Sequence, residues 1–170
     1  MVFFLSFMNI KLKNKFVYFK DYKVKCAIGK RGITSKKIEG DKCTPKGKFG
    51  LKYIFYRSDR VKIPKSCLQL KPIKKKFGWC NDIKSKSYNK FITFPFKYRA
   101  ERLYRSDNIY DIIAVLDYNL NPVKRNKGSA IFLHVAKKNY TPTLGCVAIS
   151  KGNFKKLISL LTKKNFINIF

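Results

Sequence analysis

Hydrophobic and polar residues alternate over short stretches in the first half of the chain, and this pattern predicts β-strands rather than helices. Residues 15–22, 23–29 and 49–56 carry it. Between them, Thr44-Pro45-Lys46-Gly47 combines proline with glycine, as tight turns do. The stretch 65–89 is irregular, and a loop this long in a compact domain tends to serve a function.

The second half contains the most apolar segments. Residues 110–116 and 129–135 are hydrophobic nearly throughout, as expected of central strands. After a loop that contains Pro142, residues 145–149 return to extended or tightly turned backbone. The sequence therefore predicts a mainly β domain of five or six strands.

A closing helix is expected after Ser150, which is a good N-cap residue. Apolar residues recur beyond it at helical spacing, namely Phe154, Leu157, Ile158 and Leu161. The chain has no internal repeat and no linker-like composition, so we expect one domain over residues 1–170, mainly β, with a C-terminal α-helix and small helical insertions.

The charge of the chain is strongly positive. Its 39 Lys and Arg residues against 9 Asp and Glu residues give a net charge of +30. Such a surface favours polyanionic partners, but Lys, Ile, Asn and Phe together are also what A/T-rich coding produces. The basic residues are spread along the chain without a nucleic-acid-binding motif. An anionic cell-wall polymer is therefore a possible partner, and nucleic acid is not expected.

The five cysteines form an odd set without a CxxC spacing, which argues against structural zinc and leaves at least one thiol unpaired. No apolar run is long enough for a transmembrane helix. The apolar start is too short for a convincing signal peptide. Residues 1–14 are thus a degenerate signal or an over-extended start, with Met8 as the true beginning.

One pair of residues suggests chemistry. The only histidine, His134, lies in an apolar strand, and Cys146 follows Gly145 twelve residues later. If the intervening loop folds back in a hairpin-like excursion, the imidazole could accept the thiol proton and make a cysteine nucleophile. Backbone N–H groups near Gly145 and Cys146 could then face an oxyanion. Both residues could equally be ordinary core residues.

Longer stretches resemble one enzyme family. The segment from Gly128 to Ala148, with its strand-borne histidine and its Thr143-Leu144-Gly145-Cys146 motif, resembles the active-site segment of the L,D-transpeptidases (YkuD type). Residues 39–49 are similar to the G-D-x-x-T-P-x-G-x-F turn of a branch of that family. Residues 78–82, 88–89 and 101–104 resemble the same branch, so the likeness runs over nearly the whole chain.

The resemblance implies a β-sandwich-like fold, Cys146 as nucleophile and His134 as general base. It also implies that Thr143 and Gly145 help to stabilise the oxyanion and to position the substrate. Leu144 and Ala148 depart from the residues that many members carry there. Weaker candidates for the substrate groove or for substrate charges are Trp79, Tyr140, Arg102, Arg105, Asp82 and Asp111.

The implied reaction is acyl transfer on peptidoglycan stem peptides, without metal or organic cofactor, by a monomer in the periplasm or cell wall. Two alternatives remain open. A related cysteine amidohydrolase, such as an L,D-carboxypeptidase, would pass the acyl group to water. A non-enzymatic basic domain would bind polyanions and leave Cys146 and His134 inert.

Overall fold

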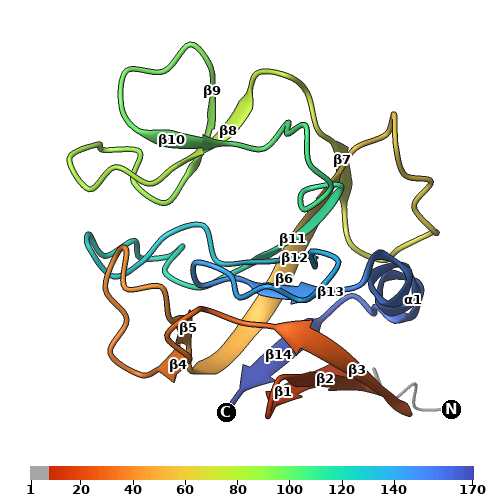
Figure 1. Ribbon diagram of the computed structural model, residues 1–170. Helices are drawn as coiled ribbons and strands as arrows, with labels where there is room; N and C mark the ends of the chain where they lie inside the picture. The colour runs from red at the N-terminus through yellow and green to blue at the C-terminus, as the bar shows by residue number, and fades with distance from the viewer. Residues whose placement is uncertain (1–7) are drawn as a thin grey trace, which may run out of the picture.

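The structure, a computed structural model, describes residues 8–170 (Figure 1). Its strands are β1 (Met8–Lys13), β2 (Phe16–Phe19), β3 (Tyr22–Ala27), β4 (Ile33–Thr34), β5 (Thr44–Pro45), β6 (Gly47–Tyr56), β7 (Leu70–Pro72), β8 (Phe77–Cys80), β9 (Phe91–Thr93), β10 (Ala100–Arg102), β11 (Ile112–Leu116), β12 (Phe132–Val135), β13 (Val147–Ile149) and β14 (Asn165–Ile169). The helix α1 (Lys151–Leu160) is the only one in this range. The predicted mainly β fold with a C-terminal helix is confirmed.

The small helical insertions that we expected are absent from residues 8–170. The long connections consist of turns instead, as between β8 and β9. There, single bonds such as Ser85 N–H to the Asp82 carbonyl (3.0 Å) and Tyr88 N–H to the Ser85 carbonyl (3.1 Å) close each turn. The Asp82 and Ser85 side chains also bind backbone N–H groups nearby. Short polar side chains that bind local backbone in this way compete with helix formation.

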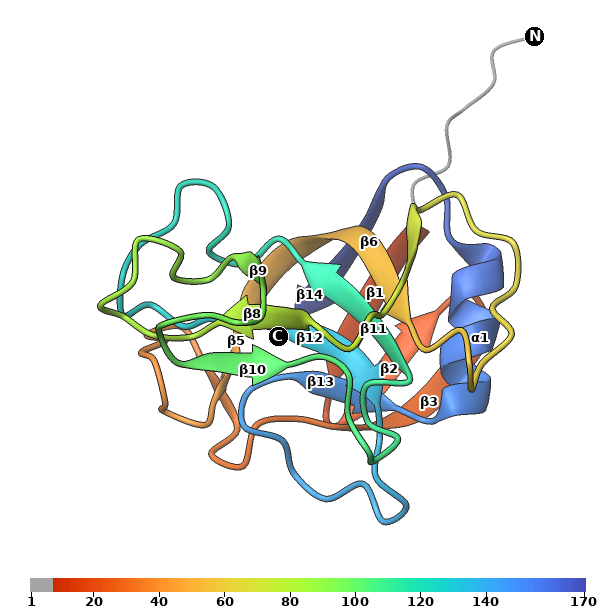
Figure 2. The same cartoon turned by 90° about the horizontal axis from the view of Figure 1, so that it is seen from above.

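Most strands belong to one sheet that curls into a barrel. Its nine strands follow the order β11-β12-β13-β3-β2-β1-β14-β6-β7, and a further pairing of β11 with β6 closes the ring. The ring contains eight of the nine strands, and β7, which pairs with β6 outside the ring, is an edge strand. A separate sheet of β10, β8 and β9 lies above β11–β13 in Figure 1, and Figure 2 shows it from above, across the same strands.

The long strand β6 forms one corner of the barrel. Its first half pairs with β14 and its second half with β11. At the change of partner, the Gly50 N–H donates to the Asp117 carboxylate (2.8 Å). A Cβ atom on Gly50 would lie 2.7 Å from the same carboxylate, so only glycine fits this close approach.

Side chains of β11 and β12 alternate between two hydrophobic cores. The barrel core lies inside the ring and takes Ala114 and Leu133, among others. The upper core lies between the barrel wall and the β10-β8-β9 sheet, and it takes Val115 and Phe132. Both faces of these strands are therefore buried, which explains why their sequences read as continuous apolar runs. The side chain of His134 is directed toward the upper core, since it shares a face with Phe132.

The helix α1 covers the barrel core at one side. Ser150 caps it by accepting a hydrogen bond from the Asn153 N–H (3.3 Å), as the sequence predicts. Phe154, Leu157 and Ile158 are buried in the barrel core. Burial of each such side chain contributes about 1.5–3 kcal/mol. At its first turn, Lys151 Nζ lies 2.6 Å from the buried Asp111 carboxylate, which ties the helix to the start of β11.

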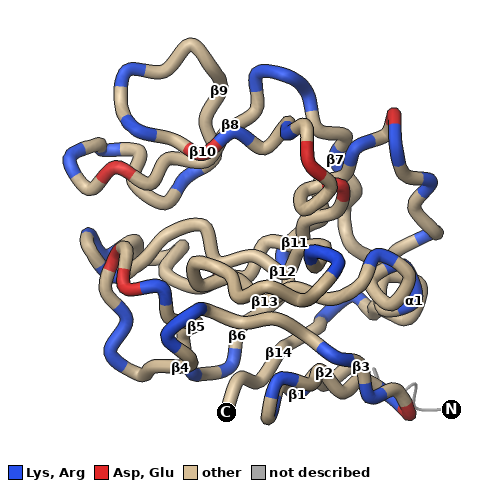
Figure 3. The backbone as a smooth tube through the Cα atoms, viewed as in Figure 1, with Lys and Arg blue, Asp and Glu red and all other residues tan. Residues whose placement is uncertain are grey.

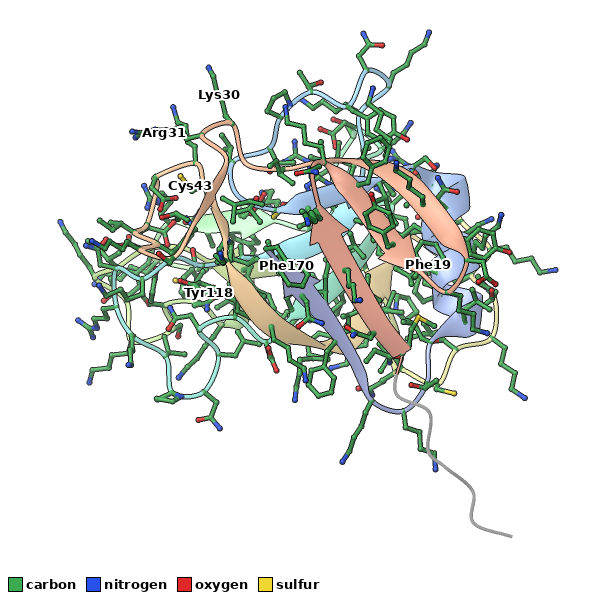
Figure 4. All side chains as sticks on the ribbon, turned by 90° about the horizontal axis from the view of Figure 1, so that it is seen from below. Phe19, Lys30, Arg31, Cys43, Tyr118 and Phe170 are labelled. Atoms are coloured by element: carbon green, nitrogen blue, oxygen red, sulfur yellow. The ribbon has the colours of Figure 1, made fainter. Side chains whose placement is uncertain are left out.

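The first and last strands pair on the underside of the barrel, where β1 runs parallel to β14 (Figure 4). Ile10 and Leu12 of β1 are fully buried. Residues 8–13 are therefore a structural strand of the barrel, and the expectation of a degenerate signal or an over-extended start within residues 1–14 stays a prediction. Of that range, residues 1–7 lie outside the described residues. Within residues 8–170, no helix is both long and apolar enough to cross a membrane.

Candidate active site

Cys146 lies at the end of the loop that leads from β12 into β13, and Thr143 fixes that loop. The Thr143 hydroxyl donates to the Cys146 carbonyl (2.6 Å) and accepts from the Gly145 N–H (3.1 Å). Its backbone N–H donates to the Ile28 carbonyl (2.8 Å), which anchors the loop to the end of β3. Thr143 therefore sets the direction in which the Cys146 side chain leaves the backbone.

Gly145 is required by the packing of this turn. Its φ of +141° is unfavourable for other residues. A Cβ atom there would lie 2.9 Å from the Cys43 carbonyl oxygen. The Gly145 N–H is already bound to Thr143, so the expectation that it faces an oxyanion is not supported in this arrangement. The Cys146 N–H remains the candidate donor for that role.

The Cys146 thiol is partly buried and bound to the backbone at the entry to β12. It donates to the Ala130 carbonyl (3.1 Å) and accepts from the Phe132 N–H (3.4 Å). Burial, followed by the nearby Glu101 carboxylate, raises the pKa of the thiol to about 12. Cys146 is therefore a protonated thiol at neutral pH, and its reactivity requires a base.

His134 on β12 is 7% exposed. Its Nδ1 lies 2.9 Å from the Val135 carbonyl oxygen. Because a carbonyl only accepts hydrogen bonds, Nδ1 carries the proton, and the lone pair is on Nε2. Burial lowers the pKa of His134 to about 4. The imidazole is thus neutral and offers one basic nitrogen.

The strand register brings these two residues to one face. β12 and β13 pair in parallel, with His134 opposite Ala148, two residues beyond Cys146. Both side chains reach the upper core, since Cys146 packs against it and the His134 ring lies 5.5 Å from the Tyr110 ring. His134 on β12 and Cys146, directly before β13, therefore face the same core, and the meeting of thiol and imidazole stays a prediction. The strands run parallel, however, instead of forming a hairpin, because the loop returns the chain to the starting end of β12.

Thiol and imidazole are each bound to backbone atoms, and among the described residues no hydrogen bond joins them to each other. Catalytic hydrogen bonds are often long or absent before substrate binds. Rotation of the Cys146 side chain away from the Ala130 carbonyl is the smallest movement that could bring the thiol toward His134.

A network that the sequence did not suggest supports the Ala130 carbonyl. Asn89 Oδ1 accepts hydrogen bonds from the Ala130 N–H (3.0 Å) and from Trp79 Nε1 (2.9 Å). Ala130 has a φ of +52°, an uncommon conformation for a residue with a side chain. Asn89 is buried, so these bonds hold the thiol acceptor in place without competition from water.

A carboxylate also lies next to the site, that of Glu101 in the family-like stretch 101–104, to which the sequence assigned no role. The Tyr110 hydroxyl donates to Glu101 Oε1 (2.6 Å). The Tyr110 ring also packs edge-on against His134, at 5.5 Å between ring centroids. Tyr110 opens an apolar strand and looks like a core residue in the sequence, and Glu101 comes from the distant strand β10. Only the folded upper sheet brings them to Cys146.

The other predicted residues lie in several environments. Trp79 is buried and packs edge-on against Phe132, so it supports the site from the upper core and is not an open groove wall. Arg102 is exposed and lies over the Phe94 ring. Tyr140 is partly buried in the loop before Cys146, under Lys25.

The charged candidates serve the local structure. Asp111 is buried and paired with Lys151 and Arg60, and Asp82 accepts backbone N–H bonds from Lys84 and Arg99. Arg105 is paired with Asp107. All five cysteines are free thiols. In residues 8–170, no cluster of three or more His, Cys, Asp or Glu side chains could hold a metal ion.

The family comparison agrees with this geometry. A family model, that of the L,D-transpeptidase catalytic domain (YkuD), matches residues 7–169. No curated protein matches the chain. The family consists of cysteine-dependent enzymes that act on peptidoglycan, and the matched range contains both Cys146 and His134. The chain belongs to the L,D-transpeptidase catalytic domain family.

Proposed function

We propose that this protein is a peptidoglycan L,D-transpeptidase that uses Cys146 as its nucleophile and His134 as its general base and acid. The observation that carries the proposal is a protonated thiol on the same face, and on the neighbouring strand, as a neutral imidazole whose Nε2 is free to accept a proton. The substrate polymer lies outside the cytoplasm, so we place the protein in the periplasm or cell wall.

In the first half-reaction, the Cys146 sulfur attacks the carbonyl carbon of the third stem residue while His134 Nε2 takes the thiol proton. The C–S bond forms, and the C–N bond to the terminal D-Ala breaks. The imidazolium returns its proton to the departing amine. The Cys146 N–H is the donor best placed for the oxyanion.

In the second half-reaction, an acceptor amine attacks the thioester carbonyl. The new C–N bond forms and the C–S bond breaks, while His134 Nε2 takes a proton from the attacking amine and passes it to the Cys146 sulfur. The product is a 3–3 cross-link or an attached protein, depending on the acceptor. Water in place of the amine would make the same site a carboxypeptidase.

Intact mass measurement after incubation with a tetrapeptide-bearing muropeptide tests the proposal. We expect a covalent adduct that lacks the mass of D-Ala, and its loss in Cys146→Ala. Cys67→Ala is the matched control, since Cys67 is an exposed thiol distant in the sequence, and it should label as the wild type does. An unlabelled wild type, or a labelled Cys146→Ala, would refute the proposed nucleophile. His134→Gln should slow adduct formation about 10²- to 10⁴-fold.

A further inference from the structure

The carboxylate of Glu101 has no cation partner in a chain of 39 basic residues, a property that it shares with Asp21, Glu39, Asp82 and Asp117 within residues 8–170, but of these five only Glu101 is bound to a tyrosine that packs against His134. Four other acidic residues, Asp41, Asp59, Asp107 and Asp111, form ion pairs. In the part of the chain that the structure describes, Glu101 forms none, and its one hydrogen bond comes from the Tyr110 hydroxyl. One carboxylate oxygen, Oε2, is therefore available to a ligand.

This carboxylate belongs to the active site by position. Strand β10 pairs with β8, which sets Glu101 opposite Trp79 at the roof of the upper core. Tyr110, which binds Glu101 Oε1, packs its ring against His134. Glu101 acts electrostatically on the Cys146 thiol. Glu101 is half-buried, and its Oε2 is not a fully buried unpartnered atom.

The surroundings of Glu101 make it the place where a cation would bind. The nearby charged or titratable groups are Tyr110, Arg105, Asp107, Glu39 and Cys146. Arg105 is already paired with Asp107, at 2.7 Å. Burial raises the pKa of Glu101 above its usual value, while the Tyr110 hydrogen bond opposes that shift. Lys and Arg residues are spread along the chain (Figure 3), and their positive charge repels an ammonium group.

The second half-reaction needs a group that attracts the protonated acceptor amine and removes its proton. An aliphatic amine with a pKa of about 10 is protonated at neutral pH and has no lone pair for attack. His134, with a pKa lowered to about 4, is neutral and carries no charge to attract an ammonium. A carboxylate can both attract the ammonium and accept its proton.

We infer that Glu101 binds the ammonium group of the acceptor, an aliphatic primary amine, and takes one proton from it before the amine attacks the Cys146 thioester. This inference rests on the proposed function. The ammonium gives its proton to Glu101, which becomes a neutral carboxylic acid. The free amine then forms the C–N bond, the C–S bond breaks, and His134 transfers the second amine proton to sulfur. Glu101 afterwards loses its proton to solvent.

The test separates aminolysis from hydrolysis. The acyl-enzyme is formed with the tetrapeptide muropeptide and reacts either with water or with an added primary alkylamine. The hydrolysis and aminolysis products are then quantified by mass spectrometry. Glu101→Gln keeps the acceptor oxygen for Tyr110 and removes the charge. We expect acyl-enzyme formation to stay within a few fold of wild type and the aminolysis-to-hydrolysis ratio to fall about 10- to 100-fold, the value of one charge-assisted hydrogen bond.

Two controls distinguish recognition from folding. Glu39→Gln is the matched variant, because Glu39 also accepts a hydrogen bond from a tyrosine, Tyr88, and it should keep the wild-type ratio. Hydroxylamine is largely neutral at pH 7.5 and needs no deprotonation. Glu101→Gln should therefore use hydroxylamine as well as the wild type does, and Glu101→Asp should recover part of the alkylamine transfer.

The outcomes are separable. A wild type that forms no acyl-enzyme refutes the proposed function itself. An acylated Glu101→Gln with an unchanged product ratio refutes only the role of Glu101. Equal losses with alkylamine and hydroxylamine, or loss of acylation in Glu101→Gln, overturn the assignment to ammonium binding and indicate a role in the structure of the site or in the first half-reaction.

Discussion

The protonation state of Cys146 gives the sharpest prediction for the free protein. A pre-formed thiolate–imidazolium pair would react quickly with alkylating reagents at neutral pH. Here the pKa of the thiol is raised to about 12 and that of His134 is lowered to about 4. The two residues also bind backbone atoms instead of each other. We therefore expect a neutral pair and a slow reaction with iodoacetamide.

The expected rate follows from the thiolate fraction. At pH 8 a thiol of pKa about 12 is about 10⁻⁴ thiolate, against about one quarter for an ordinary cysteine of pKa about 8.5, a ratio of about 2,000. The more basic thiolate is intrinsically about 30-fold more nucleophilic, for a Brønsted coefficient of about 0.45 over this pKa difference. Cys146 should thus react about 50- to 100-fold more slowly than free cysteine, before any steric protection is counted.

The assay is iodoacetamide labelling followed by peptide mass mapping from pH 7 to 10. The Cys146 rate should rise about tenfold per pH unit without a plateau, and the exposed Cys67 provides an internal reference. His134→Gln should leave the Cys146 rate at pH 8 nearly unchanged. Glu101→Gln should raise it, because removal of that charge lowers the thiol pKa. A plateau between pH 6 and 9, or labelling as fast as that of free cysteine, would refute the neutral pair.

Three further predictions concern stability, each measured by urea unfolding. The pKa of His134 is about 4 in the folded protein and about 6.5 in the unfolded chain, so the unfolded chain binds the proton first as the pH falls. The free energy of unfolding should therefore fall by about 3 kcal/mol between pH 6.5 and 4 because of His134. A pH series in which His134→Gln loses as much stability as the wild type would contradict this. Ser150→Ala should lower the free energy of unfolding by about 1 kcal/mol through loss of the helix cap, whereas Ser159→Ala, on the exposed side of α1, should have a smaller effect. Asp111→Asn should cost about 3 kcal/mol, the lower end for a broken buried ion pair, because Lys151 and Arg60 remain partly in solvent; a loss below 1 kcal/mol would show that the pairs are not stabilising.

Much of the fold follows from local patterns in the sequence. The apolar runs at residues 110–116 and 129–135 contain the central strands β11 and β12, because strands covered on both faces need apolar residues at every position. Ser150 and the spacing after it place α1 nearly to the residue. These features depend on short-range periodicity and capping, which a sequence displays directly.

The closure of the barrel was not predictable in the same way. It depends on pairings between distant segments, such as β1 with β14 and β6 with β11. The strand β1 looked like part of a leader, and β14 was not foreseen at all. The parallel pairing of β12 with β13 likewise depends on how the intervening loop is anchored to β3 through Thr143, which no local pattern reveals.

The site residues likewise fall into those that the local sequence indicates and those that only the tertiary fold brings together. Cys146, His134, Thr143 and Gly145 lie within thirteen consecutive positions of the sequence, so motif and spacing were enough to propose them. Asn89, Glu101 and Tyr110 come from other segments and reach the site only when the β10-β8-β9 sheet packs over the barrel. The resemblance of residues 88–89 and 101–104 to the family marked these stretches in the sequence, but it assigned no role to Asn89 or Glu101.

This division has a consequence for specificity. The residues proposed for the covalent chemistry are held by the barrel strands β12 and β13, whereas the unpaired carboxylate comes from the separate upper sheet. Because Glu101 reaches the site through Tyr110 and its own strand, changes in the upper sheet that spare Trp79 and Asn89, whose hydrogen bonds support the Ala130 carbonyl, can alter acceptor binding without moving Cys146 or His134. A series of such variants should therefore change the ratio of aminolysis to hydrolysis more than the rate of acylation, and the reverse should hold for Thr143, which fixes the Cys146 loop.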